Sequence, residues 1–240
     1  MFPIGDENAG QRLRPYVNWG LIAVNLAVFL YQLTLSRPEL NRFILRWGTI
    51  PREIAGRDDL QTLVTCQFLH GGWLHVLGNM LFLWVFGDNI EDTMGHLSYG
   101  LFYLLCGVGA SLLQVLVDTG SRTPLVGASG AISGVLAAYL VLYPRGKIRT
   151  LLFVGLPFIL LVPAYVQIGL WVLVQLVNGF ASLGVNTVET GGGVAYFAHI
   201  GGFLVGVALV WLFRDKDAQA RQLAARAGTR PYQRMAMGRR

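Results

Sequence analysis

The chain has 240 residues, of which 54% are hydrophobic and 13% carry a charge, and its formal net charge is +6. Soluble domains carry about 25% charged residues, so this composition excludes an ordinary soluble protein and predicts an integral membrane protein. The basic excess does not indicate nucleic-acid binding, because the Lys and Arg residues lie mainly in tails and loops, where they determine membrane topology. The two cysteines, Cys66 and Cys106, have no metal-ligand spacing, and no disulfide is expected between them.

Six apolar segments predict six membrane spans and an all-α polytopic fold. They are Val17–Leu35, Trp73–Gly87 extended toward Glu91, Leu97–Val117, Ser129–Tyr143, Pro157–Phe180 and Val194–Phe213. All except the fourth approach the ~20 apolar residues that a bilayer requires. The first is too long for a signal peptide and has no small-residue cleavage site after it, so we expect it to be retained. The six-helix domain therefore covers residues 17–213, between an N-terminal tail at 1–16 and a basic C-terminal tail at 214–240.

The fourth segment is unusually short. At ~1.5 Å per residue its roughly 15 residues extend ~22 Å, whereas the hydrocarbon core of a bilayer is ~30 Å thick. The helix therefore begins below the membrane surface, and residues 118–126 must dip in to meet it. Irregular backbone at that depth is tolerated only where it lines a cavity within the protein.

The distribution of Lys and Arg predicts the topology. Most of them lie in the two tails and in the loop after the fourth segment, so the positive-inside rule places both termini in the cytoplasm. The acidic loop at residues 88–95 falls on the same side. Five arginines between residues 36 and 61 oppose this assignment, but acidic residues nearly balance them, and we expect a small structured extracytoplasmic element there.

A serine and a histidine lie at matching depth in two of these spans. Ser129 precedes the cytoplasmic Arg145 by about as many residues as His199 precedes Arg214, and a difference of one residue is only ~1.5 Å along a helix. Both spans carry a Gly-xxx-Gly pattern beside these residues, which allows close helix packing. The members of the two patterns are Gly130 and Gly134 in the fourth span and Gly202 and Gly206 in the sixth.

Polar residues inside a membrane are costly and usually functional. Serine becomes a good nucleophile when a base takes its proton, and histidine is the usual base. No carboxylate lies in a span near His199, so the pattern predicts a Ser129–His199 dyad for peptide-bond hydrolysis within the membrane. The alternative interpretation is that the small residues serve helix packing alone.

The second span offers hydrogen-bond donors for a developing oxyanion. His75 and Asn79 are separated by four residues and so share one helical face, and the backbone N–H of Ser129 is a further donor at a helix N-terminus. The alternative use of this pair is a hydrogen bond between helices. His70 lies at the entrance of the same span, where a structural and a catalytic use are both open.

Two other classes of function fit the polar residues less well. A metal site would need ligand spacing such as His-Glu-x-x-His, which is missing, so we expect neither a metal nor a cofactor. A transporter or channel would need an inverted repeat or a buried charge that couples to ions, and the spans contain neither.

At these residues the chain resembles the rhomboid intramembrane serine proteases. The similarity covers residues 17–213, and the motifs that carry it are His70-x4-His75-x3-Asn79, Gly127-x-Ser129-Gly130 and Ala198-His199-x-x-Gly202-x-x-x-Gly206. It implies that Ser129 attacks the substrate, that His199 is the base, and that His75, Asn79 and the Ser129 amide stabilise the oxyanion. It also implies supporting positions, namely Gly127, Gly130, Gly202, Gly206 and His70. Where some members carry an aromatic residue stacked on the catalytic histidine, this chain has Ser133.

The resemblance also implies the partners and the location. Expected substrates are single-span membrane proteins with a strained or helix-breaking segment, cut near the outer face of the membrane. The alternative is a catalytically silent rhomboid-like protein that binds or escorts transmembrane helices. The absence of a transit peptide favours a bacterial plasma membrane. We expect residues 181–193, with their three consecutive glycines, to cap the site, and the basic C-terminal tail to meet anionic lipid headgroups.

Overall fold

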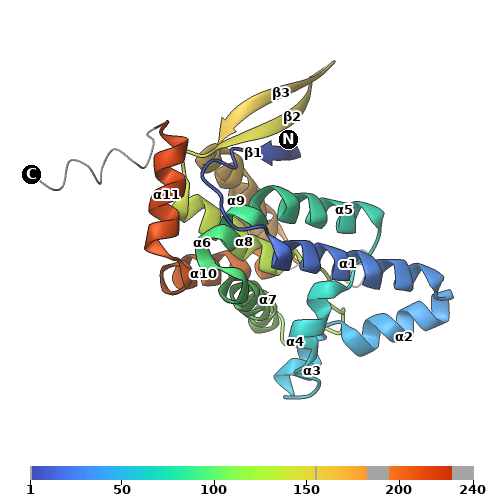
Figure 1. The fold of residues 1–240 in the computed structure, drawn as a ribbon. Coiled ribbons are helices and arrows are strands. Elements are labelled where there is room, and N and C mark those ends of the chain that lie inside the picture. The colour runs from blue at the N-terminus through green and yellow to red at the C-terminus, as the bar shows by residue number, and fades with distance from the viewer. Residues whose placement is uncertain (1, 155, 183–194, 229–240) are drawn as a thin grey trace, which may run out of the picture.

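The computed structural model describes residues 2–154, 156–182 and 195–228, which are mostly helical (Figure 1). The long helices are α1 (Tyr16–Thr34), α7 (His96–Val117), α8 (Ser129–Leu142), α9 (Ala164–Ala181) and α10 (Tyr196–Phe213). The shorter ones are α2 (Arg37–Trp47), α3 (Pro51–Ala55), α4 (Thr62–Thr65), α5 (Trp73–Phe82), α6 (Asp88–Met94) and α11 (Lys216–Arg226). Three strands, β1 (Phe2–Asp6), β2 (Lys147–Val154) and β3 (Leu156–Pro163), form one sheet in the order β1-β2-β3.

Among the residues that the structure describes, four helices, α1, α7, α9 and α10, are long and apolar enough to cross a membrane. A fifth span is added if the bent pair Thr62–Phe68 and Trp73–Met94, which turns by 96°, counts as one. Helix α8 is apolar but shorter, as its sequence predicts. These features confirm a polytopic helical membrane protein, and each of the six predicted segments contains a helix.

The predicted fifth segment is partly wrong. It was expected to be helical from Pro157, but the helix begins at Ala164, and residues 156–163 form β3, which pairs antiparallel with β2. Proline lacks a backbone N–H and is tolerated in edge strands and at helix starts, which matches Pro157 in the outer strand and Pro163 at the N-cap of α9.

The acidic segment at residues 88–95 is also different from the expected loop. It forms α6, which continues α5 through a π-helical turn at Leu83–Gly87, so the chain is helical from Trp73 to Met94. Its acidic side chains Glu91 and Asp92 are buried. The acidic residues make this segment look like a solvated loop in the sequence. Their hydrogen-bond partners come from distant parts of the chain and cannot be recognised from the segment itself.

The N-terminal strand, the β2–β3 hairpin and α11 gather at one end of the helices, and α2 and α3 lie at the other end (Figure 1). The first three segments are those that the charge distribution assigns to a common side. Residues 36–61, expected to be structured, contain α2 and α3. The expected cap at 181–193 lies almost entirely outside the described residues.

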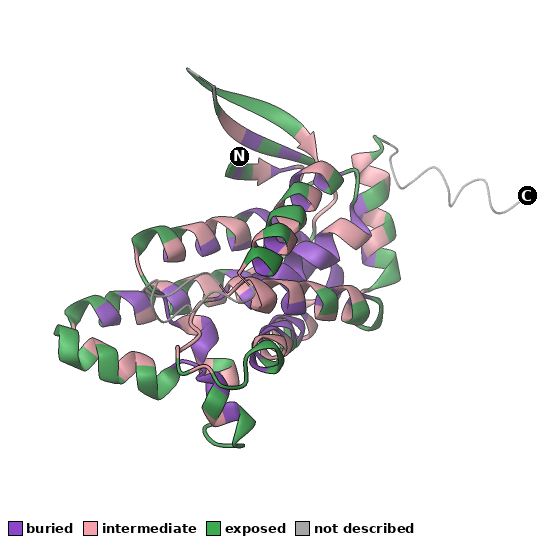
Figure 2. Ribbon diagram, turned by 180° about the vertical axis from the view of Figure 1, so that it is seen from behind, coloured by how far each residue is buried: buried purple, intermediate pink, exposed green. Residues whose placement is uncertain are grey.

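Helix α8 lies at the centre of the molecule, where buried residues concentrate (Figure 2). Its glycines meet those of α10 directly. A Cβ atom on Gly202 would lie 1.9 Å from the carbonyl oxygen of Gly130, and one on Gly206 would lie 2.6 Å from the Cα of Gly134. The two backbones can approach this closely only because these positions carry no side chain. Cys66 and Cys106 are buried and free, as expected.

Candidate active site

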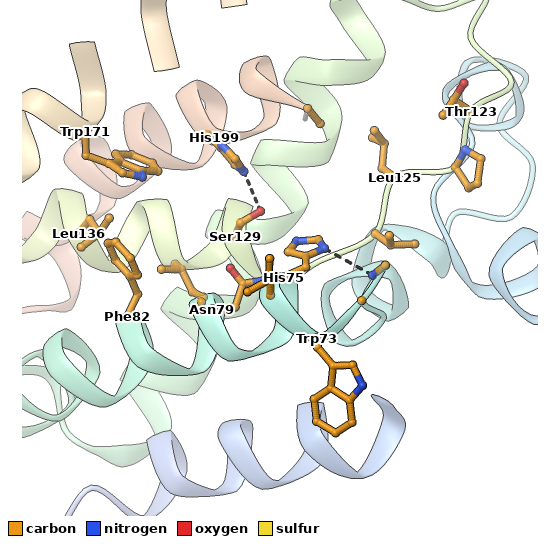
Figure 3. Close-up of a pocket in the computed structure, with 18 residues that line it drawn as sticks. Trp73, His75, Asn79, Phe82, Thr123, Leu125, Ser129, Leu136, Trp171 and His199 are labelled. Atoms are coloured by element: carbon orange, nitrogen blue, oxygen red, sulfur yellow. Dashed lines mark hydrogen bonds between the residues drawn. The ribbon is translucent and has the colours of Figure 1, made fainter. Parts of the chain in front are cut away.

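The N-terminal ends of α8 and α10 bring together a serine and a histidine that are far apart in the sequence. Ser129 is the first residue of α8, and its Oγ lies 2.7 Å from Nε2 of His199 in the first turns of α10 (Figure 3). The glycines let α8 and α10 pack closely. Because Ser129 and His199 also lie at the same depth, their side chains come within hydrogen-bond distance of each other. The geometry suits proton transfer from the hydroxyl to the imidazole.

The second nitrogen of His199 is held by α9. Its Nδ1 lies 2.7 Å from Oε1 of Gln175, and the ring of Trp171, one helical turn earlier, has its centroid 5.8 Å from that of the imidazole. Neither residue was predicted from the sequence, because the expected orienting group for a catalytic histidine is a carboxylate and not an amide. The available signal was a glutamine in a membrane span, where a polar side chain is costly without a partner.

Ser133 does not take part in holding the imidazole. Its hydroxyl donates a 2.6 Å hydrogen bond to the carbonyl oxygen of Ser129, one turn earlier in α8, and its side chain is buried. The aromatic contact to His199 comes from Trp171, on a different helix.

His75 and Asn79, on α5, lie against the backbone that precedes Ser129. A Cβ atom on Gly127, whose φ is +128°, would lie 2.6 Å from Nε2 of His75 and 3.7 Å from Nδ2 of Asn79. The backbone N–H of Gly71 donates to Nδ1 of His75 at 3.4 Å. In a neutral imidazole with Nδ1 as acceptor, Nε2 carries the hydrogen and is therefore a donor facing this backbone.

His70 lies behind Asn79. Its side chain is only 2% exposed, and its Nε2 lies 2.9 Å from Nδ2 of Asn79. Its backbone is fixed by Gln32 of α1, whose amide both accepts from the His70 N–H and donates to the His70 carbonyl oxygen. This arrangement orients the Asn79 amide and leaves His70 away from the serine.

One cavity of about 1010 Å³ is lined by Ser129, His199, His75, Asn79 and Trp171. Its walls come from α5, from the first turns of α8 and α10, from α9 and from the 123–126 segment that the short fourth span required to dip inward (Figure 3). Leu125 of that segment is held by paired backbone hydrogen bonds to Thr49. Within residues 2–154, 156–182 and 195–228, no group of three or more His, Cys, Asp or Glu side chains could hold a metal ion.

Comparison with known proteins shows which protein family this chain resembles. The family model described as the rhomboid domain matches residues 57–216. The chain is 33% identical over 188 residues to RHOMBOID-like protein 4 of Arabidopsis thaliana, covering 77% of this chain and 43% of that protein. It is 28% identical over 220 residues to Rhomboid protein 1, mitochondrial, of Saccharomyces cerevisiae, covering 88% of this chain and 57% of that protein.

A third relative is the human Presenilin-associated rhomboid-like protein, mitochondrial, with 28% identity over 212 residues, covering 82% of this chain and 50% of that protein. The chain thus spans roughly half the length of these relatives. It belongs to the rhomboid family, which agrees with the resemblance seen in its motifs.

Proposed function

We propose that this protein is an intramembrane serine endopeptidase that hydrolyses peptide bonds in or near the transmembrane segments of membrane proteins. Ser129 and His199 are the proposed catalytic dyad. The observation that carries the proposal is the 2.7 Å hydrogen bond between Ser129 Oγ and His199 Nε2 at the wall of a large cavity. Membership of the rhomboid family supports it, because the family's fold is of the intramembrane protease type.

In the proposed reaction, Ser129 Oγ attacks the carbonyl carbon of the scissile peptide bond while its proton passes to His199 Nε2. The negative charge that develops on the carbonyl oxygen is stabilised by His75, by Asn79 and by the backbone N–H of Ser129. The tetrahedral intermediate collapses, the carbon–nitrogen bond breaks, and His199 returns the proton to the leaving amine. Water then gives a proton to His199 and attacks the ester, which releases the acid and restores Ser129.

The dyad is tested by labelling the purified protein in detergent with a fluorescent fluorophosphonate, which reacts with activated serines. We expect labelling of the wild type and none of Ser129→Ala or His199→Ala. The unlabelled wild type should also cleave a single-span substrate, and labelling should abolish that cleavage because it blocks Ser129. A folded wild type that neither labels nor cleaves would contradict the proposal and favour the silent, helix-binding alternative.

We also propose that the protein lies in a cell membrane with both termini in the cytoplasm and with the cavity opening toward the outer face. The positive-inside rule supports this orientation, as does the position of β1, β2 and α11 at one end of the bundle (Figure 1). Single cysteines test it, because the native cysteines are buried. A membrane-impermeant maleimide added to intact cells should label Arg57→Cys and spare Lys147→Cys, and the reverse pattern would contradict the orientation.

A further inference from the structure

We propose that Gln175 is a positioning residue that holds His199 in the tautomer whose Nε2 accepts the Ser129 proton. This inference rests on the proposed function, because it concerns how the dyad is prepared for reaction. In a soluble serine hydrolase, a buried carboxylate performs this task by accepting a hydrogen bond from the other ring nitrogen. Here a neutral amide from α9 stands in the same relation to the imidazole.

The direction of the Gln175 amide is fixed by its second hydrogen bond. Its Nε2 donates to the carbonyl oxygen of Trp171 at 3.2 Å, so Oε1 is the atom that faces His199. A carbonyl oxygen can only accept, so the hydrogen of that 2.7 Å contact must belong to Nδ1 of His199. A neutral imidazole with its hydrogen on Nδ1 has a free lone pair on Nε2, which faces the Ser129 hydroxyl.

The environment explains why an amide occupies this place. Gln175 is only 7% exposed and lies on a helix long and apolar enough to span a membrane. A buried carboxylate there would carry a desolvation penalty that a single imidazole repays poorly. The amide supplies the acceptor without a charge, and it cannot change its role by gaining or losing a proton.

Trp171 completes the arrangement, because its ring packs beside the His199 imidazole at an interplanar angle of 37°. Trp171 and Gln175 are four residues apart and therefore share one face of α9. The two contacts that orient the His199 ring opposite Ser129 thus both come from α9. The base is ready to react only while α9 lies against α10.

The test compares Gln175→Met with Gln167→Met in the purified full-length protein. Methionine has a similar volume but neither accepts nor donates these hydrogen bonds. Gln167 is a matched control, because it lies on the same helix, is equally 7% exposed and bonds to Thr150 rather than to the site. We expect Gln175→Met to lower the rate of fluorophosphonate labelling and the kcat for cleavage by about 10- to 100-fold, with little change in KM. Gln167→Met should keep the wild-type rate.

Two further variants separate positioning from simple stability. Gln175→Glu keeps an acceptor oxygen in place, in either protonation state, and should recover most of the lost rate. Gln175→Asn withdraws the oxygen by one methylene and should lose rate in the same direction as methionine, with less disturbance of packing.

The outcomes separate this inference from the proposed function. If the wild type labels, Ser129→Ala does not, and Gln175→Met or Gln175→Asn labels as fast as the wild type, the role of Gln175 is overturned and the dyad stands. If glutamate at this position is as slow as methionine, an acceptor is not what matters, and the inference is equally overturned. If the wild type itself does not label, both the inference and the proposed function fall.

Discussion

The two ends of the helix bundle differ in the charge of their polar side chains and in how many hydrogen bonds hold them. At the end that carries Ser129 and His199, a few neutral polar groups face a large cavity and are each held by one or two hydrogen bonds. At the other end, charged side chains are buried in a dense hydrogen-bonded network, and the cavity that Asp6 and Asp88 line there is smaller, at about 350 Å³. The first end carries the proposed Ser129–His199 dyad, and the second end fixes the helices.

The network at the second end is centred on α6. Asp92 accepts hydrogen bonds from the backbone N–H groups of Arg12 and Leu13 and from the guanidinium of Arg221 on α11. Arg226, also on α11, donates to Asn89 of α6 at 2.5 Å. The N-terminal segment and α11 are thereby both attached to the bundle. Arg221 and Arg226 of α11 thus bond within the protein, and the expected contact of the basic C-terminal tail with lipid headgroups stays a prediction.

Glu91 performs a related task for the first span. Its carboxylate accepts from the backbone N–H groups of Val17 and Asn18, in the first turn of α1. A carboxylate at this position satisfies donors that have no partner within the helix and complements the positive end of the helix dipole. The acidic residues of α6 therefore organise the surrounding segments. Fully bonded polar networks of this kind make a structure rigid, whereas partly bonded groups at a cavity remain available to a substrate.

The largest expected effect is at the end that carries the proposed dyad. Ser129→Ala and His199→Ala should each lower cleavage by about 10⁴-fold or more, because a dyad acts as a unit. Neither substitution should change the melting temperature much, since Ser129→Ala removes one side-chain hydrogen bond at a cavity wall and His199→Ala removes two. Cleavage rates and thermal unfolding, both measured in the same detergent, check the two statements. A large loss of stability would contradict the view that this end of the bundle contributes little to stability.

Asn79→Ala should have the next largest effect. An oxyanion donor is worth about 10²–10³-fold in kcat, and the loss should appear in kcat with KM nearly unchanged. Asn79 also partners His70, so the control is His70→Phe, which keeps a ring and removes only the bond to Asn79. We expect the His70 variant to be the less impaired of the two. Equal losses in both variants would mean that Asn79 acts only while the bond to His70 orients its amide, and an unimpaired Asn79→Ala would contradict its role as an oxyanion donor.

Gly202→Ala tests the packing of α8 against α10, which brings Ser129 and His199 together. Its new Cβ would lie 1.9 Å from the Gly130 carbonyl oxygen, so α8 and α10 must separate, at a cost of about 1–3 kcal/mol in unfolding free energy. Activity should fall as well, because Ser129 and His199 move apart. Gly20→Ala is the matched control, since nothing lies within 4 Å of a Cβ there, and it should be neutral or slightly stabilising. Equal melting temperatures for the two variants would contradict the close contact.

The sequence locates the end that carries the proposed dyad better than it locates the network at the second end. The apolar runs place α1, α7 and α10 within a few residues, and the spacing of Ser129 and His199 from basic residues anticipates their common depth. The sequence predicts helix for residues 157–163, where the structure has most of β3, because a fully apolar run fits a strand or a helix equally well. Gln175 was missed because one amide in a span has no periodic or charge signature, and its role depends on how α9 turns toward α10.

The burial of charged side chains at the second end could not be predicted from the sequence either. The smallest predicted effect concerns one of them, Asp6. Burial raises the pKa of the Asp6 carboxyl to about 7, although Tyr139 donates to it at 2.6 Å and Arg226 lies 3.8 Å away. The folded state therefore binds a proton that the unfolded chain, with a carboxyl pKa of about 3.9, has already released. Stability from this group is greatest at the lowest pH, declines as the pH rises from about 4 to 7, and is constant above that.

Between pH 5 and pH 8 we expect the melting temperature of the wild type to fall by a few degrees more than that of Asp6→Asn. Asparagine keeps the shape and an acceptor oxygen for Tyr139 but cannot ionise, and all other titrating groups are common to both proteins. The comparison isolates one buried carboxyl of the network. If the wild type instead gains stability relative to Asp6→Asn as the pH rises, the ion pair with Arg226 outweighs desolvation, and the second end is stabilised by charge as well as by hydrogen bonds.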